Sequence, residues 1–128
     1  SQAKNDAFIV DAHMGTNALT DFAPLAPEGV AVRLLADSFS TKLATLQPAA
    51  ARWTQQYGAT RPLEIRLTSP RLLHDRLIVL DGAQVWALSQ SLKDFVARSP
   101  ATVLRVEGDV AEQKIHAYAQ LWANAQPL

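Results

Sequence analysis

An unbroken apolar run at residues 77–80 (Leu-Ile-Val-Leu) is the feature that most constrains how this chain folds. With no polar residue at alternate positions, the run predicts a β-strand that is buried on both faces. Asp81-Gly82 follows at once, and a second apolar run comes after it. An Asp-Gly pair between two apolar runs is a hairpin-turn signal. The segment Leu73–Asp94 is therefore predicted to be a strand, a turn and a second strand, with polar residues at its ends.

Two polar residues, His74 and Arg76, lie just before this strand. They are two positions apart, so on an extended chain their side chains point to the same side. A histidine and an arginine that enter a core need polar partners or a polar ligand, because burying an unpaired polar group is costly. This pair is therefore the first candidate for a functional site.

The spacing around the pair resembles the signature of the phospholipase D superfamily. That signature is His-x-Lys, four residues, Asp, six residues, and then Gly-Ser-x-Asn. His74 matches the histidine, Arg76 stands at the lysine position, and Asp81 falls at the aspartate. This half of the match is good in spacing, and arginine for lysine is its one change in identity.

The second half of the signature is present in altered form. Leu88 replaces the glycine, Ser89 matches the serine, and Ser91 replaces the asparagine. The His-Asp-Arg form followed by Ser-Leu-Lys-Asp looks like a branch of bacterial phospholipase-D-like domains. It also looks like the lipid-binding MIT C-terminal domains.

The resemblance implies a fold and a set of roles. The expected fold class is α/β, with a mixed β-sheet flanked by helices: a phospholipase-D-like half fold with a single motif. By resemblance His74 is the nucleophile, Arg76 is the main phosphate clamp, and Asp81 orients a histidine of its own chain or of a partner. Ser89 and Ser91 are expected to donate hydrogen bonds to the phosphate or to the site. No metal and no cofactor are implied.

One motif supplies only half of such an active site, so a homodimer is expected to bring two copies together around a two-fold axis. Lys93 is a further candidate cation near the site, although Asp94 beside it is an alternative partner for it. His13 follows the first expected strand and is a candidate pocket residue, with an ordinary surface-loop histidine as the alternative.

Composition limits the remaining possibilities. Net charge is zero, but residues 52–105 hold eight Lys or Arg against four Asp or Glu, so the excess cations surround the motif. The absence of cysteine excludes disulfides and thiolate metal sites and fits a cytoplasmic location. No apolar run reaches the roughly 18 residues of a membrane span. We expect residues 1–128 to form one domain, and its abrupt polar start leads us to expect that it was excised from a longer protein.

The apolar periodicity predicts the other elements. A helix starting at Asp37-Ser38 is expected to run to Tyr57, to be kinked or split at Pro48, and to be capped by Gly58. Asp109 and Glu112 form a capping-box-like start for a final helix. The expected strands and helices, in chain order, are a strand at 8–10, a short helix at about 16–22, a strand at 30–35, the helix ending at Tyr57, strands at 63–67, 77–80, 83–88 and 102–106, and the final helix.

Several residues have ordinary structural interpretations. His116 is expected to be a surface histidine on the final helix, and the three tryptophans are expected to lie in the core. Two of the three residues Arg61, Arg66 and Arg71 are expected to be solvated charges, although together they would extend a basic rim.

Two functions are compatible with these patterns. The first is a metal-independent, nuclease-like phosphodiesterase that works through a histidine nucleophile in a pocket completed by dimerisation. The alternative is a non-catalytic module that uses the same pocket to bind a phosphate of nucleic acid or of an acidic lipid headgroup.

Overall fold

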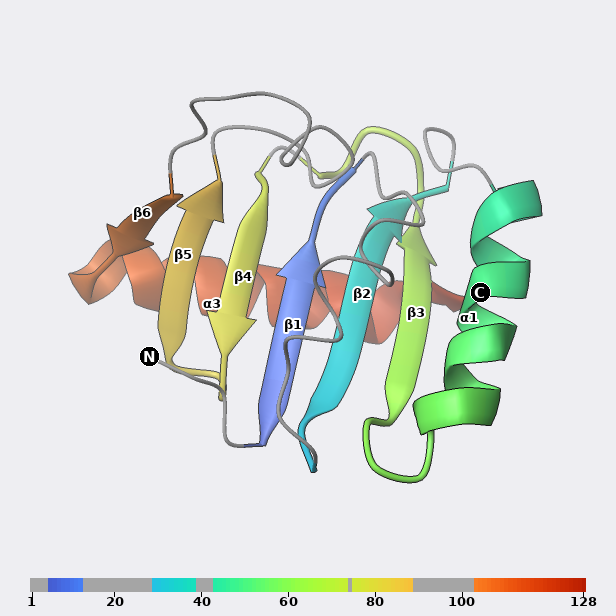
Figure 1. Cartoon of the computed structure of the whole chain (residues 1–128). Helices are drawn as coiled ribbons and strands as arrows, with labels where there is room; N and C mark the ends of the chain where they lie inside the picture. Colours follow the sequence, from blue (N-terminus) through green and yellow to red (C-terminus); the bar gives the residue numbers. More distant parts are fainter. Residues whose placement is uncertain (1–4, 13–28, 39–42, 74, 89–102) are drawn as a thin grey trace.

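The computed structural model describes residues 5–12, 29–38, 43–73, 75–88 and 103–128. Within these residues the chain forms a seven-stranded sheet and two helices (Figure 1). In chain order, the elements are β1 (Asp6–Val10), β2 (Ala31–Asp37), α1 (Leu43–Tyr57), β3 (Leu63–Thr68), β4 (Leu77–Leu80), β5 (Gln84–Leu88), β6 (Val103–Val106), α3 (Gly108–Asn124) and β7 (Gln126–Pro127).

The sheet is mixed, as the sequence predicts. Its strand order is β6-β5-β4-β1-β2-β3-β7. Strands β1, β2 and β3 are parallel to one another, and β4 is antiparallel to both of its neighbours, β1 and β5. The two edge strands, β6 and β7, are antiparallel to β5 and β3. The predicted α/β class with a mixed sheet is therefore confirmed.

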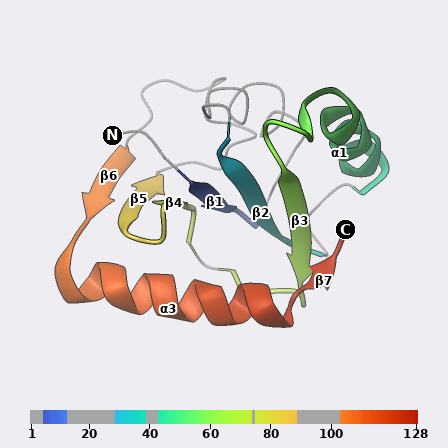
Figure 2. The same ribbon diagram turned by 90° about the horizontal axis from the view of Figure 1, so that it is seen from below.

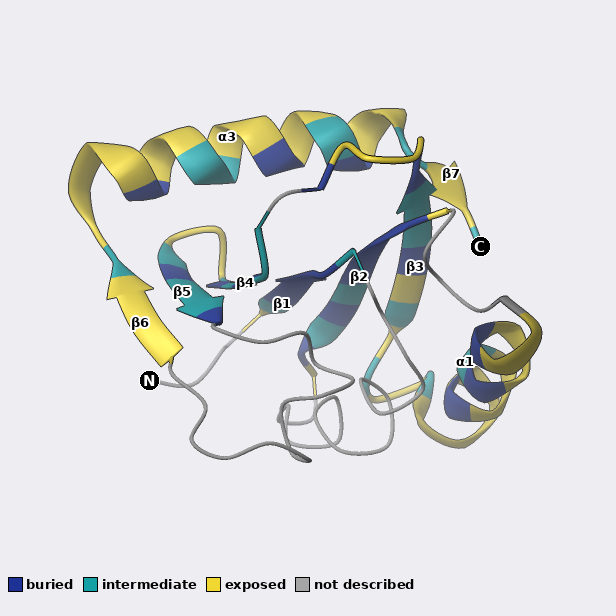
Figure 3. Cartoon of the chain, turned by 90° about the horizontal axis from the view of Figure 1, so that it is seen from above, coloured by how far each residue is buried: buried dark blue, intermediate teal, exposed yellow. Residues whose placement is uncertain are grey.

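The two helices lie on opposite faces of the sheet (Figure 2). Tyr118 and Trp122 of α3 pack against alternate apolar side chains of the central strands, and the Trp122 ring meets the Phe8 ring edge-on at 5.4 Å. On the other face, Leu46 and Trp53 of α1 pack against β2 and β3. Figure 3 shows the buried residues of both helices on the sides that face the sheet. Burial of these apolar faces is the main stabilising contribution.

Strand β4 departs from the expectation that both of its faces are buried. Leu77 and Val79 are buried on the α3 side, but Ile78 and Leu80 on the other side are only half-buried. The apolar run is therefore correct as a strand, whereas full burial was wrong for one face. The physical reason is that α1 packs mainly on β3, which lies three strands away from β4 in the sheet.

Helix α1 differs from its prediction in where it starts and in its course at Pro48. Asp37 is the last residue of β2 and does not start a helix, because β2 continues in register with β3 up to Thr68. Pro48 lies inside α1, which is not split there. Proline removes one backbone hydrogen bond, and packing of Leu46 and Trp53 on the sheet holds the helix on both sides of it.

Helix α3 also starts differently. Glu107 is its N-cap residue and makes no side-chain capping bond, while Asp109 lies inside the first turn. An acidic residue there favours the helix through the macrodipole, so the capping box was wrong although the helix was right. Val110, in the first turn, is 54% exposed and does not belong to the apolar face of the helix.

The remaining elements are strand β6, strand β7 and the segments outside the described residues. Strand β6 is confirmed, but β7 was not foreseen; it pairs with β3, and the Leu128 N–H donates to the Ile65 carbonyl at 3.0 Å. The predicted helix at 16–22 lies outside the described residues. No helix in the described part of the chain is both long enough and apolar enough to cross a membrane.

Gly58, the predicted cap, follows α1 directly and allows a first test of the fold. A Cβ atom at this position would overlap the carbonyl oxygen of Thr54, a backbone atom that cannot rotate away. We expect Gly58→Ala to lower the free energy of unfolding in urea by about 1–3 kcal/mol, the usual cost of overpacking.

Gly82→Ala is the control, because its added Cβ meets no atom within 4 Å and only its positive φ of 66° opposes the change. A Gly58→Ala protein as stable as the wild type would contradict the close approach of Gly58 to the Thr54 carbonyl at the end of α1.

Candidate functional site at one edge of the sheet

The candidate site lies along the edge of the sheet where the carboxyl ends of the parallel strands meet. Asp11 follows β1, Asp37 ends β2 and Thr68 ends β3. Because β4 runs the opposite way, Arg76, which precedes it, lies at this same edge, and so does Leu88 at the end of the next strand. This is the upper end of the sheet in Figure 1, where the ends of β1, β2, β3 and β5 and the start of β4 lie.

A backbone hydrogen bond joins the two halves of the sequence motif. The Leu88 N–H donates to the Arg76 carbonyl at 2.9 Å, which continues the β4–β5 ladder by one step beyond the pair Leu77 and Ala87. Arg76 itself is half-buried. The residue at the motif's lysine position is thus held beside the residue at its glycine position.

Five of the predicted site residues lie outside the described residues: His13, His74, Ser89, Ser91 and Lys93. The chain is described on both sides of His74, up to the residue before His13, and up to the residue before Ser89. Ala12, Leu73 with Asp75, and Leu88 are the nearest described residues, and all of them adjoin this edge of the sheet. Their convergence on one site stays a prediction.

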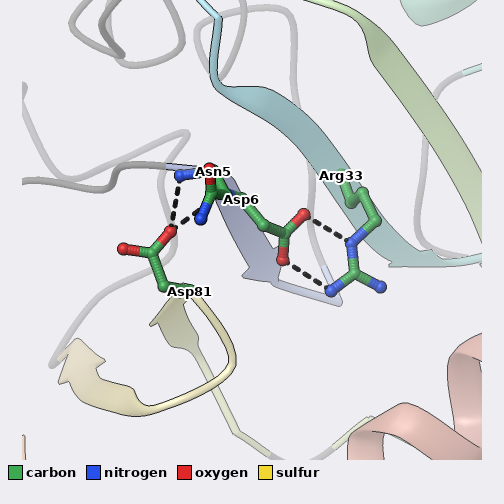
Figure 4. A network of polar contacts seen from close by, with 4 residues as sticks. All are labelled: Asn5, Asp6, Arg33 and Asp81. Atoms are coloured by element: carbon green, nitrogen blue, oxygen red, sulfur yellow. Dashed lines mark hydrogen bonds and ion pairs between the residues drawn. The ribbon is translucent and has the colours of Figure 1, made fainter.

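Asp81 lies at the other end of β4 from Arg76. The two are separated by the four residues of the strand, each of which advances the chain by about 3.3 Å. The Asp81 Oδ1 atom accepts hydrogen bonds from the backbone N–H groups of Asn5 at 2.7 Å and Asp6 at 3.0 Å (Figure 4). Within one chain, Asp81 therefore fastens the hairpin turn to the start of β1, and contact with a site at the far edge would require a second copy.

The turn itself has the predicted geometry. Asp81 and Gly82 have φ values of 55° and 66°, and the Ala83 N–H donates to the Leu80 carbonyl at 3.0 Å. Positive φ at both central residues is the requirement of a hairpin turn that matches strand twist, and aspartate and glycine tolerate it best.

The same end of the sheet carries a second polar contact. Asp6 accepts two hydrogen bonds from Arg33, at 2.9 Å from Nε and 2.7 Å from the terminal nitrogen (Figure 4). The Arg33 guanidinium also lies over the rings of Phe8 and Trp122, at 4.3 and 5.1 Å from their centroids. This arginine therefore joins β1, β2 and α3, so we assign it a structural role.

At the candidate-site edge, three buried polar residues were missed as site residues. Asp11 is fully buried, and Asp37 and Thr68 are each 3% exposed. Asp37 accepts a hydrogen bond from the Arg71 N–H at 2.7 Å, while the Thr68 hydroxyl has no partner among the described residues. The signal that the sequence offered for Asp11 and Asp37 was an acidic residue at the end of an apolar strand.

Asp75, between the two motif residues, was also missed. Its carboxylate accepts hydrogen bonds from Lys114 Nζ, at 3.0 Å to each oxygen, and from the Tyr118 hydroxyl at 2.5 Å. The signal in the sequence was weak, because it required knowing which face of α3 meets this segment.

The residues given structural interpretations behave mostly as expected. His116 is exposed, Trp53 and Trp122 are buried, and Trp86 is half-buried beneath the Arg105 guanidinium. Arg66 is not a free surface charge, because it pairs with Glu64 at 2.7 Å and lies 4.4 Å from the centroid of the Trp122 ring.

Arg61 lies over the Tyr57 ring, and Arg71 is exposed. The described residues contain no group of three His, Asp or Glu side chains placed to hold a metal ion.

Comparison with known proteins identifies the fold. No protein-family model and no curated protein sequence matches the chain. Among solved structures, Nuc from Salmonella typhimurium, a phospholipase D family member, is 18% identical with a TM-score of 0.67 over 98% of this chain and 83% of that chain. NucT from Helicobacter pylori is 12% identical with a TM-score of 0.60 over 98% of this chain and 84% of that chain.

A third solved structure, TrmBL2, is an archaeal chromatin protein described with a novel mode of DNA binding. It is 16% identical with a TM-score of 0.54, and the match covers 98% of this chain but 46% of that chain. The chain therefore has a phospholipase-D-like fold, as the motif led us to expect.

The position of Asp81 generates a stability test. Asp81→Ala removes the acceptor of two backbone hydrogen bonds and places alanine at a positive φ, so we expect a loss of about 1–3 kcal/mol in the free energy of unfolding. Asp81→Asn keeps an oxygen acceptor and tolerates the same φ, so it should unfold close to the wild type in the same urea titration. Equal stability of Asp81→Ala and the wild type would contradict the fastening role.

Proposed function

We propose that the chain is a metal-independent phosphodiesterase of the nuclease-like kind, with its site at the edge where β4 begins and β5 ends. The observation that supports this most is the hydrogen bond between Arg76 and Leu88, because it brings the two halves of the motif together in space. The phospholipase-D-like fold, shared with Nuc and NucT, supports it independently.

In the proposed reaction, a neutral His74 imidazole nitrogen attacks phosphorus. A nitrogen–phosphorus bond forms, the bond from phosphorus to one ester oxygen breaks, and the departing oxygen takes a proton from an acid. Water then attacks the phosphohistidine, releasing the phosphomonoester and restoring the imidazole. The acid is a second histidine, which a partner copy's motif or His13 would supply.

Arg76 would stabilise the charge that develops on the non-bridging oxygens. A guanidinium offers a planar, two-pronged contact, whereas the ammonium that usually stands in this motif is a compact point charge. Ser89 and Ser91 would add hydrogen bonds, and Lys93 a second cation. Asp81, which lies at the far end of β4 in its own chain, would orient a histidine only across a dimer.

A homodimer completes this proposal, because one chain carries one motif and therefore one nucleophile. Two copies related by a two-fold axis would place two histidines around one phosphorus. The substrate would be a phosphodiester of nucleic acid or of a phospholipid headgroup, and we place the protein in the cytoplasm on the ground that its sequence has no cysteine.

A non-catalytic phosphate-binding module is the second candidate. The arginine at the lysine position and the altered Gly-Ser-x-Asn segment favour it, because both changes keep anion binding while altering the catalytic set. The likeness in fold to TrmBL2, a chromatin protein, adds support for a ligand such as nucleic acid.

Turnover of a chromogenic phosphodiester separates the two candidates. We expect bis(p-nitrophenyl) phosphate to be cleaved in the presence of EDTA, with His74→Ala inactive and Arg76→Ala lowered about 10²-fold in kcat, as for loss of a charge-stabilising group. His116→Ala is the matched control, since that histidine is exposed on α3, and it should retain wild-type activity.

Activity that depends on added metal would refute the mechanism. No turnover, together with phosphate binding that Arg76→Ala weakens, would establish the binding module instead. If neither turnover nor phosphate binding responds to these variants, both candidate functions are wrong.

The assembly can be measured separately. Light scattering at micromolar concentration should give twice the chain mass, and the dimer should persist in His74→Ala, because that change removes chemistry and not the interface. A monomer at concentrations where the wild type is active would eliminate the shared pocket.

A further inference from the structure

The connection between β3 and β4, residues 69–76, is anchored at alternate positions. The Arg71 N–H donates to the buried carboxylate of Asp37, Leu73 is buried in the core beneath α3, and Asp75 binds two side chains of α3. The backbone is therefore held on both sides of residue 74. Asp75, the last of these anchors, directly precedes Arg76.

Two donors from one face of α3 bind the Asp75 carboxylate. Lys114 Nζ lies 3.0 Å from both carboxylate oxygens, and the Tyr118 hydroxyl donates at 2.5 Å. Lys114 and Tyr118 are four residues apart, which places them on the same side of α3. Tyr118 is also buried among core side chains, so its hydroxyl is a fixed donor.

Helix α3 is a rigid support for this anchor. It spans 17 residues across the face of the sheet, and its Trp122 packs on Phe8 of β1. The contact therefore ties the start of β4 to an element that the central strands already fix. Charge-assisted hydrogen bonds of this kind are short and directional, so they set position as well as adding energy.

We propose that Asp75, held by Lys114 and Tyr118, is a positioning residue for the site. It fixes the connection into β4 against α3, and so sets where Arg76 stands relative to the end of β5. The proposal deepens the proposed function and rests on it.

Loss of an ion pair with a purely structural role would leave kcat unchanged. Partly exposed pairs contribute little to global stability, and the side chains of Asp75 and Lys114 are 33% and 29% exposed. The pair between Arg66 and Glu64 is similar in kind but lies within β3, away from the motif. It therefore provides a matched control for the loss of an ion pair that positions nothing at the site.

The test compares four variants with the wild type. Tyr118→Phe removes only the hydroxyl, Lys114→Met removes the cation, Lys114→Arg keeps it, and Glu64→Gln breaks the control pair. With bis(p-nitrophenyl) phosphate, we expect kcat to fall at least about tenfold in Tyr118→Phe and Lys114→Met with KM changed less than about twofold. Lys114→Arg should retain at least half of the wild-type kcat, and Glu64→Gln all of it.

A second readout does not depend on turnover. Hydrogen exchange of the Leu88 amide, which donates to Arg76, should accelerate at least about tenfold in Tyr118→Phe and Lys114→Met. The Asp11 amide, which donates to Leu35 at the same edge, is the internal reference and should be unchanged. Acceleration at both amides would indicate general loosening and would overturn the proposal.

The outcomes separate this proposal from the one it rests on. If the wild type turns over no substrate but the Leu88 amide responds as expected, the enzymatic function fails and the positioning contact stands. If the wild type is active and the Lys114 and Tyr118 variants match Glu64→Gln in kcat and in exchange, the positioning role is wrong. A loss of kcat that Lys114→Arg does not rescue would also overturn it.

Discussion

The antiparallel placement of β4 between β1 and β5 is the constraint on which the candidate site depends. Because β4 runs against its neighbours, Arg76, which precedes it, lies beside Leu88, the last residue of β5, although twelve positions separate the two in the sequence. The hydrogen bond between their backbones fixes that neighbourhood. Reversing the strand direction would place the two halves of the motif at opposite edges of the sheet.

Carboxylates have different structural roles at the two ends of β4. At the hairpin end, Asp81 accepts backbone hydrogen bonds, and the strand is closed against β1. At the other end, Asp37 and Asp75 hold the incoming connection, one through a backbone N–H and the other through α3. A buried carboxylate is costly unless it is hydrogen-bonded, so these contacts specify the path of the chain into the strand.

Local signals in the sequence predicted most of the fold. The Asp81-Gly82 pair defined the hairpin, and alternation or continuity of apolar residues located the strands, because these depend on neighbours in the chain. Features that depend on distant contacts were missed. Asp37 resembles a helix cap, yet pairing with β3 extends β2 through it. The β7 strand has only two residues and forms because β3 offers an open edge. Asp75 gave no local sign of its partners on α3.

For the site, the spacing of the motif predicted which strand ends meet, whereas the side-chain arrangement of His74 and Ser89 lies beyond the described residues.

The most direct test of the central claim, that this edge binds an anionic phosphorus group, is an anomalous difference map from crystals soaked in tungstate, which mimics phosphate. The account predicts a tungstate peak within hydrogen-bond distance of the Arg76 guanidinium, beside the carboxyl end of β5. Tungstate bound elsewhere on the protein, with no peak at Arg76, would contradict it.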